Sequence, residues 1–588
     1  MAVDQSPMNK LITEHIDIWT SAVKTRSTSG RGSSKKLELY GIKKLRELII
    51  ELAIQGKLTA NLDFKGSAKK NVEDAIVAKF NLSKERNIRG DKETYSSDRA
   101  KGFPLHWETI CVGQVAHVLG GKRVPKGYKL SEQPTDFVYL RVTDMKNQSI
   151  DESDLRYISE EVFKQISRYT INTGDVYVTI AGTIGAVGTI PPHLDGMSLT
   201  ENAAKLVFSG LSKKYLVTVL QSSFVTRQFN DAVNQMAQPK LSLNSIKHTC
   251  IPIPPLEEQE YIADKVDELM ALCDQLEQQT EDSIEAHQVL VTTLLDTLTN
   301  SADADELMQN WARISEHFDT LFTTEESIDQ LKQTILQLAV MGALSQPLNS
   351  DTPIDVHLDN ILEQQKQLAT AKEYSLIEAE VLKAKNEISN NRVVLKARCF
   401  CNFITKGTTP SKNELLETGD VPFLKVYNIV NNELDFDYRP IFISNEVHTS
   451  KLKRSIAHPG DVIMNIVGPP LGKVAVLSEQ YPQWNMNQAL AVFKPVSSVF
   501  NRYLYYVLSC ELTLRSVLSE VKGTAGQDNL SLEQCRDLLV PIMSIQEQQR
   551  LVCLVDSLWD YCDRLKKRMK SSQKTQLHLT DAVTGQAV

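Results

Sequence analysis

The chain has 588 residues, 42% of them hydrophobic and 23% charged, which predicts an ordinary globular protein of roughly three to five structural units. It has nine cysteines without a CxxC pair, no signal-like start and no apolar run long enough for a bilayer, so we expect a cytoplasmic protein without disulfides, a zinc ribbon or a membrane span. The net charge of −8 is unevenly distributed: residues 256–300 carry twelve acidic residues and one basic residue, whereas 101–255 carry sixteen Lys and Arg against thirteen Asp and Glu, so charge neither supports nor excludes phosphate binding.

A short amphipathic helix is the first predicted element, and it lies in an N-terminal helical region, residues 1–100. The apolar residues on its predicted face are Ile42, Leu45, Ile49 and Leu52. Gly56 is suited to end this helix. The polar stretch 65–99 is interpreted as a loop or linker.

A mixed domain follows at 101–255. Its strand-like runs, punctuated by Gly and Pro, are 137–142, 175–180 and 204–208. Pro254 and Pro255 mark its end. A long spacer helix is then predicted over 256–300.

The rest of the chain repeats this order, which indicates a tandem duplication. The matching segments are Leu45–Leu58 with Leu331–Leu344, Gly174–Val176 with Gly460–Val462, Asn202–Phe208 with Asn487–Phe493, and Leu256–Gln259 with Ile545–Gln548. The second copy predicts a helical connector at 301–395, a second mixed domain at 396–542 and a second long helix at 543–588. The fold class is therefore α+β, with two mixed domains and a pseudo-twofold internal repeat.

Both long helices carry a narrow apolar seam with alternating spacings of four and three residues, as in a coiled coil. The seam residues are Ile262, Val266, Leu269, Cys273 and Leu276 in the first helix and Leu551, Val555, Leu558, Cys562 and Leu565 in the second. We expect the two helices to pair antiparallel; the alternative is that each packs on its own domain. A helix over 256–300 is on the order of 65 Å long, so it could hold two such domains well apart.

Residues 404–429, ITKGTTPSKNELLETGDVPFLKVYNI, resemble the opening of a target-recognition domain in specificity subunits of type I restriction–modification systems. The first copy departs from this pattern, because residues 120–127 read GGKRVPKG, but 137–144, FVYLRVTD, still resemble the following strand. The Gly-Asp-Val stretch, the glycine turn up to Gly185 and the Glu-Glu-Gln helix start complete the resemblance, which covers most of residues 101–568.

The resemblance implies a non-catalytic protein that binds double-stranded DNA through both domains and reads an asymmetric two-part target. It also implies two methyltransferase subunits and restriction/translocase subunits as partners. S-adenosylmethionine, ATP and Mg²⁺ are expected on those partners, and no cofactor or metal is expected on this chain.

Polar residues in loops and at strand ends are the candidate DNA contacts, because Lys and Arg serve phosphates and guanine edges and hydroxyls serve either. In the first domain they are Lys122, Arg123, Lys126, Lys129, Arg141, Thr143, Lys146 and Thr183. In the second they are Lys406, Thr408, Thr409, Ser411, Lys412, Lys425, Tyr427, Asn428 and Lys473. The alternative for each is an ordinary solvated surface residue.

Other residues near the same loops favour structural roles. Gly182, Gly185, Gly468 and Gly472 are interpreted as tight-turn glycines. Helix capping is the favoured role of a further set, with phosphate contact as the alternative: Lys240, Ser242, Asn244, Gln527, Asn529 and Ser531.

Enzyme motifs do not fit. The stretch 468–473, GPPLGK, is too short for a phosphate-binding Walker loop and is followed by Val474, and no HExxH is present. Two alternatives to a specificity subunit remain: a divergent nuclease with duplicated DNA-binding domains, and a scaffold that never touches DNA.

Overall fold

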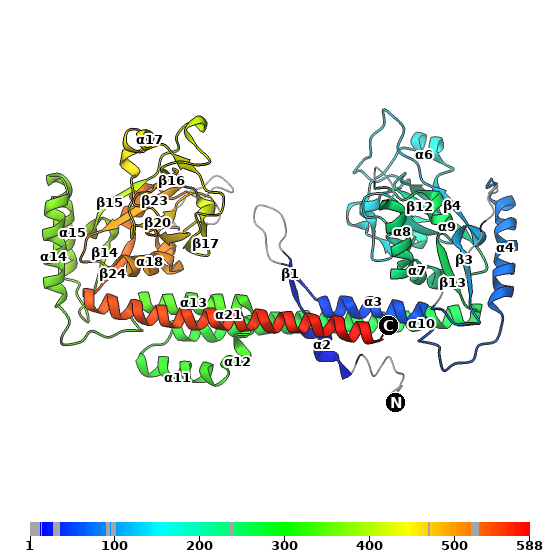
Figure 1. The fold of residues 1–588 in the computed structure, drawn as a ribbon, viewed down its shortest axis with the longest axis horizontal. Coiled ribbons are helices and arrows are strands. Elements are labelled where there is room, and N and C mark those ends of the chain that lie inside the picture. The colour runs from blue at the N-terminus through cyan, green and yellow to red at the C-terminus, as the bar shows by residue number, and fades with distance from the viewer. Residues whose placement is uncertain are drawn as a thin grey trace. The chain divides into compact units, whose positions relative to one another are not determined.

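The computed structural model describes residues 12, 14–26, 36–89, 95, 102–234, 239–468, 471–518 and 529–587. Within them the chain forms two compact units (Figure 1). The first unit contains the described residues up to 282 together with 573–587, and the second contains residues 283–572. Each unit thus holds one copy of the repeat and the last part of the long helix that begins in the other copy.

A four-stranded antiparallel sheet in the order β10-β9-β12-β4 forms the centre of the first unit. The first unit also contains a three-stranded sheet, β5-β11-β8, and the strand pairs β13-β3, β6-β7 and β1-β2. The strands are β1 Lys24–Arg26, β2 Lys36–Glu38, β3 Glu108–Cys111, β4 Ala116–Gly120, β5 Tyr139–Leu140, β6 Met145–Lys146, β7 Ser149–Ile150, β8 Thr170–Ile171, β9 Val176–Thr179, β10 Val187–Thr189, β11 Met197–Leu199, β12 Ala203–Phe208 and β13 Cys250–Ile253. The predicted strand at 137–142 is therefore shorter, because a 3₁₀ turn, Val142–Asp144, follows β5.

The second unit repeats this sheet order as β15-β23-β20-β21. Its other strands form the sheet β19-β16-β22 and the pairs β14-β24 and β17-β18. The bounds are β14 Val393–Lys396, β15 Cys401–Lys406, β16 Val421–Leu424, β17 Ile429–Val430, β18 Glu433–Leu434, β19 Phe442–Ile443, β20 Val462–Asn465, β21 Val474–Val476, β22 Asn485–Met486, β23 Leu490–Pro495 and β24 Leu539–Ile542. The duplication predicted from sequence is thus present in the topology of both units.

The structure corrects one match within the repeat. Strand β12 pairs Leu206 with Val176, and strand β23 pairs Phe493 with Val462 in the equivalent position. Ala203–Phe208 therefore corresponds to Leu490–Pro495, and the sequence match of Asn202 with Asn487 is wrong by two residues. The shared Asn and the apolar run favoured the wrong alignment, whereas backbone pairing fixes the right one.

The helices complete both units. In the first repeat they are α2 Ile16–Ser21, α3 Tyr40–Ile54, α4 Ala68–Glu85, α5 Val112–Val115, α6 Glu160–Ile166, α7 Lys213–Gln221, α8 Ser223–Asn234, α9 Leu243–His248 and α10 Leu256–Thr299. In the second they are α11 Ala304–Glu316, α12 Phe318–Leu321, α13 Glu325–Val340, α14 Ile354–Leu368, α15 Ala371–Lys385, α16 Ala397–Phe400, α17 Asn445–Thr449, α18 Asn501–Ser509, α19 Glu511–Leu518, α20 Leu532–Asp537 and α21 Ile545–Ala587. No described helix is both long and apolar enough to cross a membrane.

The helix α4 corrects the interpretation of residues 65–99 as a loop or linker. Ser67 caps its N-terminus by accepting a hydrogen bond from the Lys70 amide, and Ala68, Val72 and Ala75 are buried. Small and β-branched residues make this stripe narrow, so the polar composition concealed a helix with one packed face.

The predicted amphipathic helix is α3, and its predicted face is buried. Ile42, Leu45 and Ile49 are at most 1% exposed. Gly56 has a φ of +72°, and the Lys57 amide donates to the Leu52 carbonyl at 3.0 Å, which is the glycine-dependent helix ending that the sequence predicted.

In the first unit α3 lies antiparallel to the first part of α10. Arg46 contacts Asp274 and Glu277 at 2.7 and 2.6 Å, and Thr59, just after the end of α3, donates to Glu258 near the start of α10 at 2.7 Å. The end of α21 joins them, because Tyr40 of α3 donates to Asp581 at 2.7 Å. Helices α3, α10 and α21 therefore lie in one bundle.

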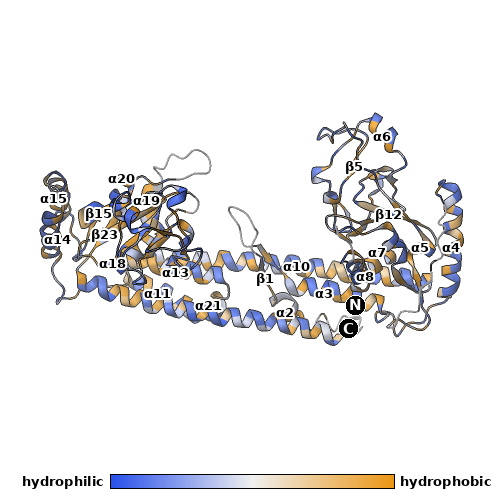
Figure 2. Ribbon diagram, turned by 45° about the horizontal axis from the view of Figure 1, so that its top comes forward, coloured by the Kyte–Doolittle hydropathy of each residue, from blue (hydrophilic) through white to orange (hydrophobic). Residues whose placement is uncertain are grey.

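The second unit has the same bundle, made of α13, the first part of α21 and the last part of α10. Lys332 contacts Asp563 at 2.6 Å and Lys570 contacts Glu325 at 3.2 Å, so α13 and α21 are antiparallel. Gln330 of α13 donates to Thr292 of α10 at 3.2 Å. Figure 2 shows hydrophobic and hydrophilic residues alternating along α10 and α21.

The coiled-coil seams lie inside these bundles. Ile262, Val266, Leu269 and Cys273 are buried in the first unit and Leu551, Val555 and Cys562 in the second, whereas Leu276, Leu558 and Leu565 are half-buried. In the second unit the seam shares one core with Val291, Leu295 and Leu298 of α10 and with Ile328, Leu331 and Ile335 of α13. Each long helix thus packs both on the short helix of its own repeat and in a bundle with the other long helix, so the two sequence-based alternatives both hold in part.

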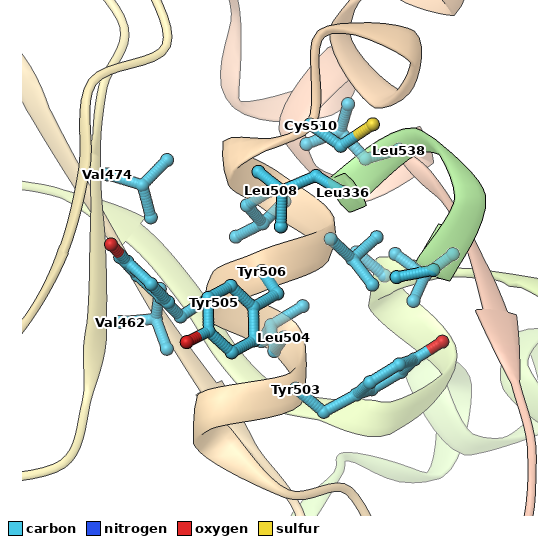
Figure 3. Packing of buried hydrophobic residues seen from close by; sticks show 14 of the residues in the cluster. Leu336, Val462, Val474, Tyr503, Leu504, Tyr505, Tyr506, Leu508, Cys510 and Leu538 are labelled. Carbon is cyan, nitrogen blue, oxygen red and sulfur yellow. The ribbon is translucent and has the colours of Figure 1, made fainter. Parts of the chain in front are cut away.

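Aromatic residues of α18 fill the core between the second sheet and the bundle (Figure 3). Tyr505 points toward Val462 and Val474 of the sheet, and its hydroxyl donates to the Asn432 carbonyl at 2.9 Å. Tyr503 points to the other side and donates to the Pro541 carbonyl at 2.6 Å. Burial raises the pKa of Tyr505 to about 12. The hydroxyls therefore stay neutral and satisfy buried carbonyls.

The buried histidine of α14 predicts an acid-sensitive second unit. His357 is 2% exposed, and burial lowers its pKa. As the pH falls below about 6.5, this imidazole is therefore protonated in the unfolded chain before it is protonated in the folded chain. The stability contributed by the neutral ring is present above that pH and is lost as the pH falls through the folded pKa. We expect the urea midpoint to fall less between pH 7.5 and 5.5 for His357→Met than for wild type, with the exposed His193→Gln behaving like wild type. An equal fall in all three proteins contradicts this prediction.

Candidate nucleic-acid interface

A single turn connects the candidate segments of the first domain. This turn, Leu199–Ala203, is called here the first hub turn. It accepts hydrogen bonds from the amides of Gly121 and Lys122 at 3.1 and 2.9 Å. Its Thr200 amide donates to the Leu140 carbonyl at 3.1 Å, and its Asn202 carbonyl accepts from Ile180 at 2.8 Å. The loop after β4, the end of β5 and the end of β9 therefore meet at one place.

The second domain has the same arrangement around Met486–Leu490, the second hub turn. The amides of Gly407 and Thr408 donate to its Leu490 and Met486 carbonyls at 3.0 and 3.1 Å. The Asn487 amide of this turn donates a hydrogen bond to the Leu424 carbonyl at the end of β16, at 3.0 Å. Two domains with different loop sequences thus present their loops from the same backbone frame.

Glycine is required where each loop leaves its sheet. A Cβ added to Gly121 would lie 2.1 Å from the Thr200 carbonyl oxygen, and one added to Gly407 would lie 2.1 Å from that of Met486. Both clashes are with backbone atoms, so no side chain can be accommodated at either position without moving the hub turn. The glycines explain why the loop and the turn can be in direct backbone contact.

The basic loop after β4 carries exposed side chains. Lys122, Arg123, Lys126 and Lys129 are all exposed. The Lys122 ammonium lies 5.6 Å from the Tyr169 ring centre, and Arg123 contacts Glu201 of the hub turn at 2.9 Å. These cations are accessible to a ligand, and one of them is oriented by a carboxylate.

Strand-end residues of the first domain are engaged within the protein. Arg141 contacts Asp144 at 2.7 Å and Asp154 at 3.2 Å, and hydrogen bonding to Asp144 raises the pKa of this guanidinium. Lys146 contacts Asp151 at 2.8 Å, and that hydrogen bond lowers the pKa of the Asp151 carboxyl. Thr143 and Thr183 are exposed. Arg141 and Lys146 are therefore less available than the sequence suggested.

The loop after β15 in the second domain is exposed and short of free hydroxyls. Lys406, Thr408, Thr409, Ser411 and Lys412 are all exposed. Thr409 donates to Gln488 of the hub turn, and Ser411 donates to Glu414 at 2.7 Å. The Lys451 ammonium beside Glu414 lowers the pKa of that carboxyl to about 2. Thr409 and Ser411 are therefore less available to a ligand than the two exposed lysines.

One candidate residue after β16 is wrong as a ligand contact. Asn428 is 1% exposed, and its side chain donates to the carbonyls of Asp435 and Tyr438 at 3.1 and 3.0 Å while accepting from the Lys425 amide. It is a structural residue of the turn. Lys425 and Tyr427 are half-buried, and Lys473 donates to the Ile429 carbonyl at 3.4 Å.

The glycines assigned to turns take that role, and two of the six residues assigned to caps are helix caps. Gly182, Gly185, Gly468 and Gly472 have φ values between +77° and +83°. Ser242 and Ser531 cap α9 and α20 by accepting from the Ser245 and Gln534 amides. Lys240, Asn244 and Asn529 are exposed, and Gln527 lies outside the described residues.

Sequence reasoning missed Glu201 and Gln488, which occupy equivalent positions in the two hub turns. Glu201 contacts Arg123 and accepts from Tyr139 at 3.2 Å, whereas Gln488 accepts from Thr409. A carboxylate and an amide at matched places suit different base edges, since Glu accepts from cytosine and Gln pairs with adenine. The misaligned Asn match concealed this pair.

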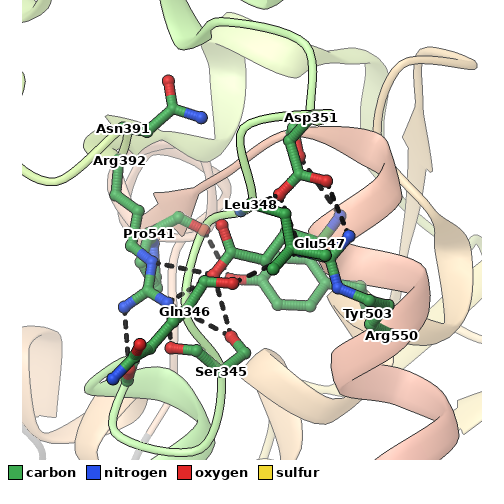
Figure 4. A network of polar contacts seen from close by, with 12 residues as sticks. Ser345, Gln346, Leu348, Asp351, Asn391, Arg392, Tyr503, Pro541, Glu547 and Arg550 are labelled. Carbon is green, nitrogen blue, oxygen red and sulfur yellow. Dashed lines mark hydrogen bonds and ion pairs between the residues drawn. The ribbon is translucent and has the colours of Figure 1, made fainter.

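The repeated Glu-Gln motif has a structural role at the start of each long helix. Glu258 is 1% exposed and accepts from Trp107 at 3.1 Å and contacts His106 at 2.9 Å. Its counterpart Glu547 is fully buried and contacts Arg392 and Ser345 (Figure 4). These contacts join the first long helix to the start of its mixed domain and the second long helix to the connector that precedes its mixed domain.

The neighbouring glutamine completes this attachment. Gln259 accepts from the Ser212 amide at 3.0 Å and donates to the Pro254 carbonyl at 2.9 Å. Gln548 makes the same pair of bonds with Phe500 and Met543. Both polar groups of each buried amide are satisfied, so the motif fixes the helix direction relative to the sheet.

The described residues contain no group of three or more His, Cys, Asp or Glu side chains placed to hold a metal ion.

The model of the type I restriction modification DNA specificity domain matches residues 104–286 and 399–573, which is one match for each mixed domain and more than half of the chain. The chain belongs to the family of type I restriction enzyme specificity subunits.

Relatives in this family match along the whole length. The EcoAI specificity subunit of Escherichia coli is 32% identical over 99% of this chain and 100% of its own. The EcoEI specificity subunit of the same species is 31% identical over the same shares. A solved chain from a type I R-M system, described in terms of complex assembly and conformational transition, is 16% identical over 82% of this chain and 98% of its own, with a TM-score of 0.45.

Proposed function

We propose that this specificity subunit is a non-catalytic DNA-recognition protein that reads an asymmetric target in two parts, one through each mixed domain. The observation that carries the proposal is the pair of hub turns: one backbone frame occurs in both domains and presents different side chains. The first frame presents Glu201 beside a loop with four exposed basic residues, and the second presents Gln488, which accepts from Thr409, beside two exposed lysines. Domains with one geometry and two chemistries suit two different half-sites.

The partners in this proposal are two methyltransferase subunits and the restriction/translocase subunits of a prokaryotic cytoplasmic complex. Each unit has its own three-helix bundle attached by a Glu-Gln motif, which supports one equivalent platform per methyltransferase. In this proposal S-adenosylmethionine, ATP and Mg²⁺ bind to those partners, and the specificity subunit determines which DNA sequence the complex binds.

A base-resolution methylation map tests the proposal. We expect a methylation-free bacterial host that expresses this chain with its methyltransferase to show one asymmetric motif, made of two short half-sites and a fixed gap. Omitting this chain is expected to remove the motif. An unchanged map, with an active methyltransferase and an assembled complex, contradicts the proposal and favours a scaffold; metal-dependent cleavage by the pure chain favours a nuclease.

Lys122→Ala is expected to weaken DNA binding without unfolding the first domain. Its ammonium is exposed and its loop is fixed through the backbone rather than through this side chain. Loss of one phosphate contact reduces the slope of log K against log salt concentration by about 1. Titration of the assembled complex onto target duplex at several salt concentrations measures this. Lys164→Ala, which removes an exposed lysine paired with Glu160 on α6, is the control and should keep the wild-type slope.

A further inference from the structure

A strained arginine lies in the turn after β18. Arg439 has a φ of +55°, a left-handed conformation that is unfavourable for a residue with a Cβ. It also precedes Pro440, which itself favours extended backbone at the preceding position. Strain of this kind persists where surrounding contacts hold it, and it is concentrated at functional sites.

Two residues next to β16 hold this turn. Tyr427 donates its hydroxyl to the Arg439 carbonyl at 3.2 Å, and buried Asn428 donates to the carbonyls of Tyr438 and Asp435 at 3.0 and 3.1 Å. The Tyr438 amide donates to the Asp435 carboxylate at 3.1 Å. The rings of Tyr427 and Tyr438 meet edge to face, with centres 6.1 Å apart. The turn is therefore preorganised by the segment that adjoins the second hub turn.

The arginine side chain itself is presented to solvent. Its guanidinium carbon lies 5.2 Å from the centre of the Tyr438 ring, and Tyr438 is 48% exposed. Arg439 is exposed as well, and among the described residues no carboxylate forms an ion pair with it. Stacking on an aromatic face orients the planar fork while leaving its donors unoccupied.

The first domain has no such arginine at the matching place. The turns with positive φ at Asn147 and Asn431 align the two segments, which places Asp154 opposite Tyr438. Asp154 is bound by Arg141 and Arg156 at 3.2 and 2.9 Å. The pair Tyr438–Arg439 is therefore a feature of the second domain alone, as expected for a residue that distinguishes one half-site from the other.

We propose that Arg439 reads a guanine in the half-site of the second domain, donating two parallel hydrogen bonds to its N7 and O6 atoms in the major groove. This inference rests on the proposed function. A phosphate contact needs only charge at a suitable distance, whereas a bidentate base contact needs a fixed plane. The strained backbone, the supporting residues Tyr427 and Asn428 and the ring of Tyr438 together fix the orientation of the Arg439 guanidinium plane.

Two substitutions at this position separate the possible roles. Arg439→Gly removes the side chain and relieves the strain, since glycine adopts positive φ freely, so the protein should keep or gain thermal stability. Arg439→Lys keeps the charge and removes the planar fork. Arg454→Gly removes another exposed arginine of the same domain and controls for the loss of charge.

The experiment maps methylation for each variant with its methyltransferase and then measures binding of the complex to the mapped duplex. We expect both Arg439 variants to lose preference at one guanine of one half-site by about 10- to 100-fold, with the other half-site and the Arg454→Gly map unchanged. Replacing that guanine by 7-deazaguanine should weaken wild-type binding about tenfold and leave Arg439→Gly binding nearly unchanged.

Three outcomes overturn the inference. A wild-type map with Arg439→Lys shows that a charge without the planar fork is sufficient. An equal loss on all DNA sequences with Arg439→Gly shows a phosphate contact, and an unchanged map for both variants shows no contact. In each of these the wild-type chain still gives a two-part motif, so the proposed function stands. A wild-type map without such a motif overturns the proposed function and the inference together.

Discussion

Leu269→Asp is expected to destabilise the helical bundle of the first unit by at least about 4 kcal/mol, because removing a buried leucine side chain alone costs about 2–5 kcal/mol and the new carboxylate enters an apolar seam. Leu269 is fully buried on α10, four residues before buried Cys273, whose thiol pKa is raised by burial to about 11. Hydrogen exchange of the α3 and α10 amides measures the loss directly, and size-exclusion chromatography with the methyltransferase measures its effect on assembly.

The control lies on the same helix. Leu272 is 41% exposed, so Leu272→Asp adds the same charge outside the seam and should change stability by no more than about 0.5 kcal/mol. Lys122→Ala should leave the bundle intact while weakening DNA binding. Equal loss of folding in the two aspartate variants would show that helix charge, rather than the buried seam, governs the bundle.

The parts of the fold that depend on periodic apolar residues were predictable. The face of α3, the seams of α10 and α21 and the duplication follow from spacing alone, and Gly56 ends its helix as expected because its φ is positive. What spacing could not give was the partner of each seam. A narrow apolar stripe fits a two-helix or a three-helix bundle equally well. The ion pairs of Arg46 and Lys332 show the antiparallel pair in each unit, and the hydrogen bonds of Tyr40 with Asp581 and of Gln330 with Thr292 show the third helix.

The candidate site was predictable as loops but not as side chains. Their clustered Lys, Arg, Thr and Ser residues identified the loops, whereas the structure shows that Gly121 and Gly407 fix them in backbone contact with a hub turn. The hub turns themselves are contacts between segments distant in sequence, so no local pattern marks them. Asn428 looked like a presented polar residue because composition cannot distinguish an exposed amide from one that holds three backbone groups inside a turn.

Exchanging the first mixed domain for that of a relative is expected to change one half-site of the methylated motif and leave the other unchanged. The natural boundaries are near residue 102 and Pro255, between α4 and α10. The structure adds a condition, because α4 packs on this domain: Arg86 contacts buried Asp175 at 3.0 Å, and the Lys79 carbonyl lies 3.1 Å from His117. An exchange of residues 102–255 alone keeps α4 but replaces the domain surface that Arg86 and Lys79 contact, which is expected to weaken the packing of α4.

The exchange should therefore be made in two forms, residues 102–255 alone and residues 68–255 with α4 included. Both are expected to give the same new half-site, because the hub turn and its loops lie within the shorter segment. The longer form should have the higher thermal midpoint, since α4 then keeps its own partners. A map in which both half-sites change would show that the domains do not read independently. A longer form that is no more stable would show that the Arg86–Asp175 pair does not limit stability, because α4 tolerates a foreign domain surface.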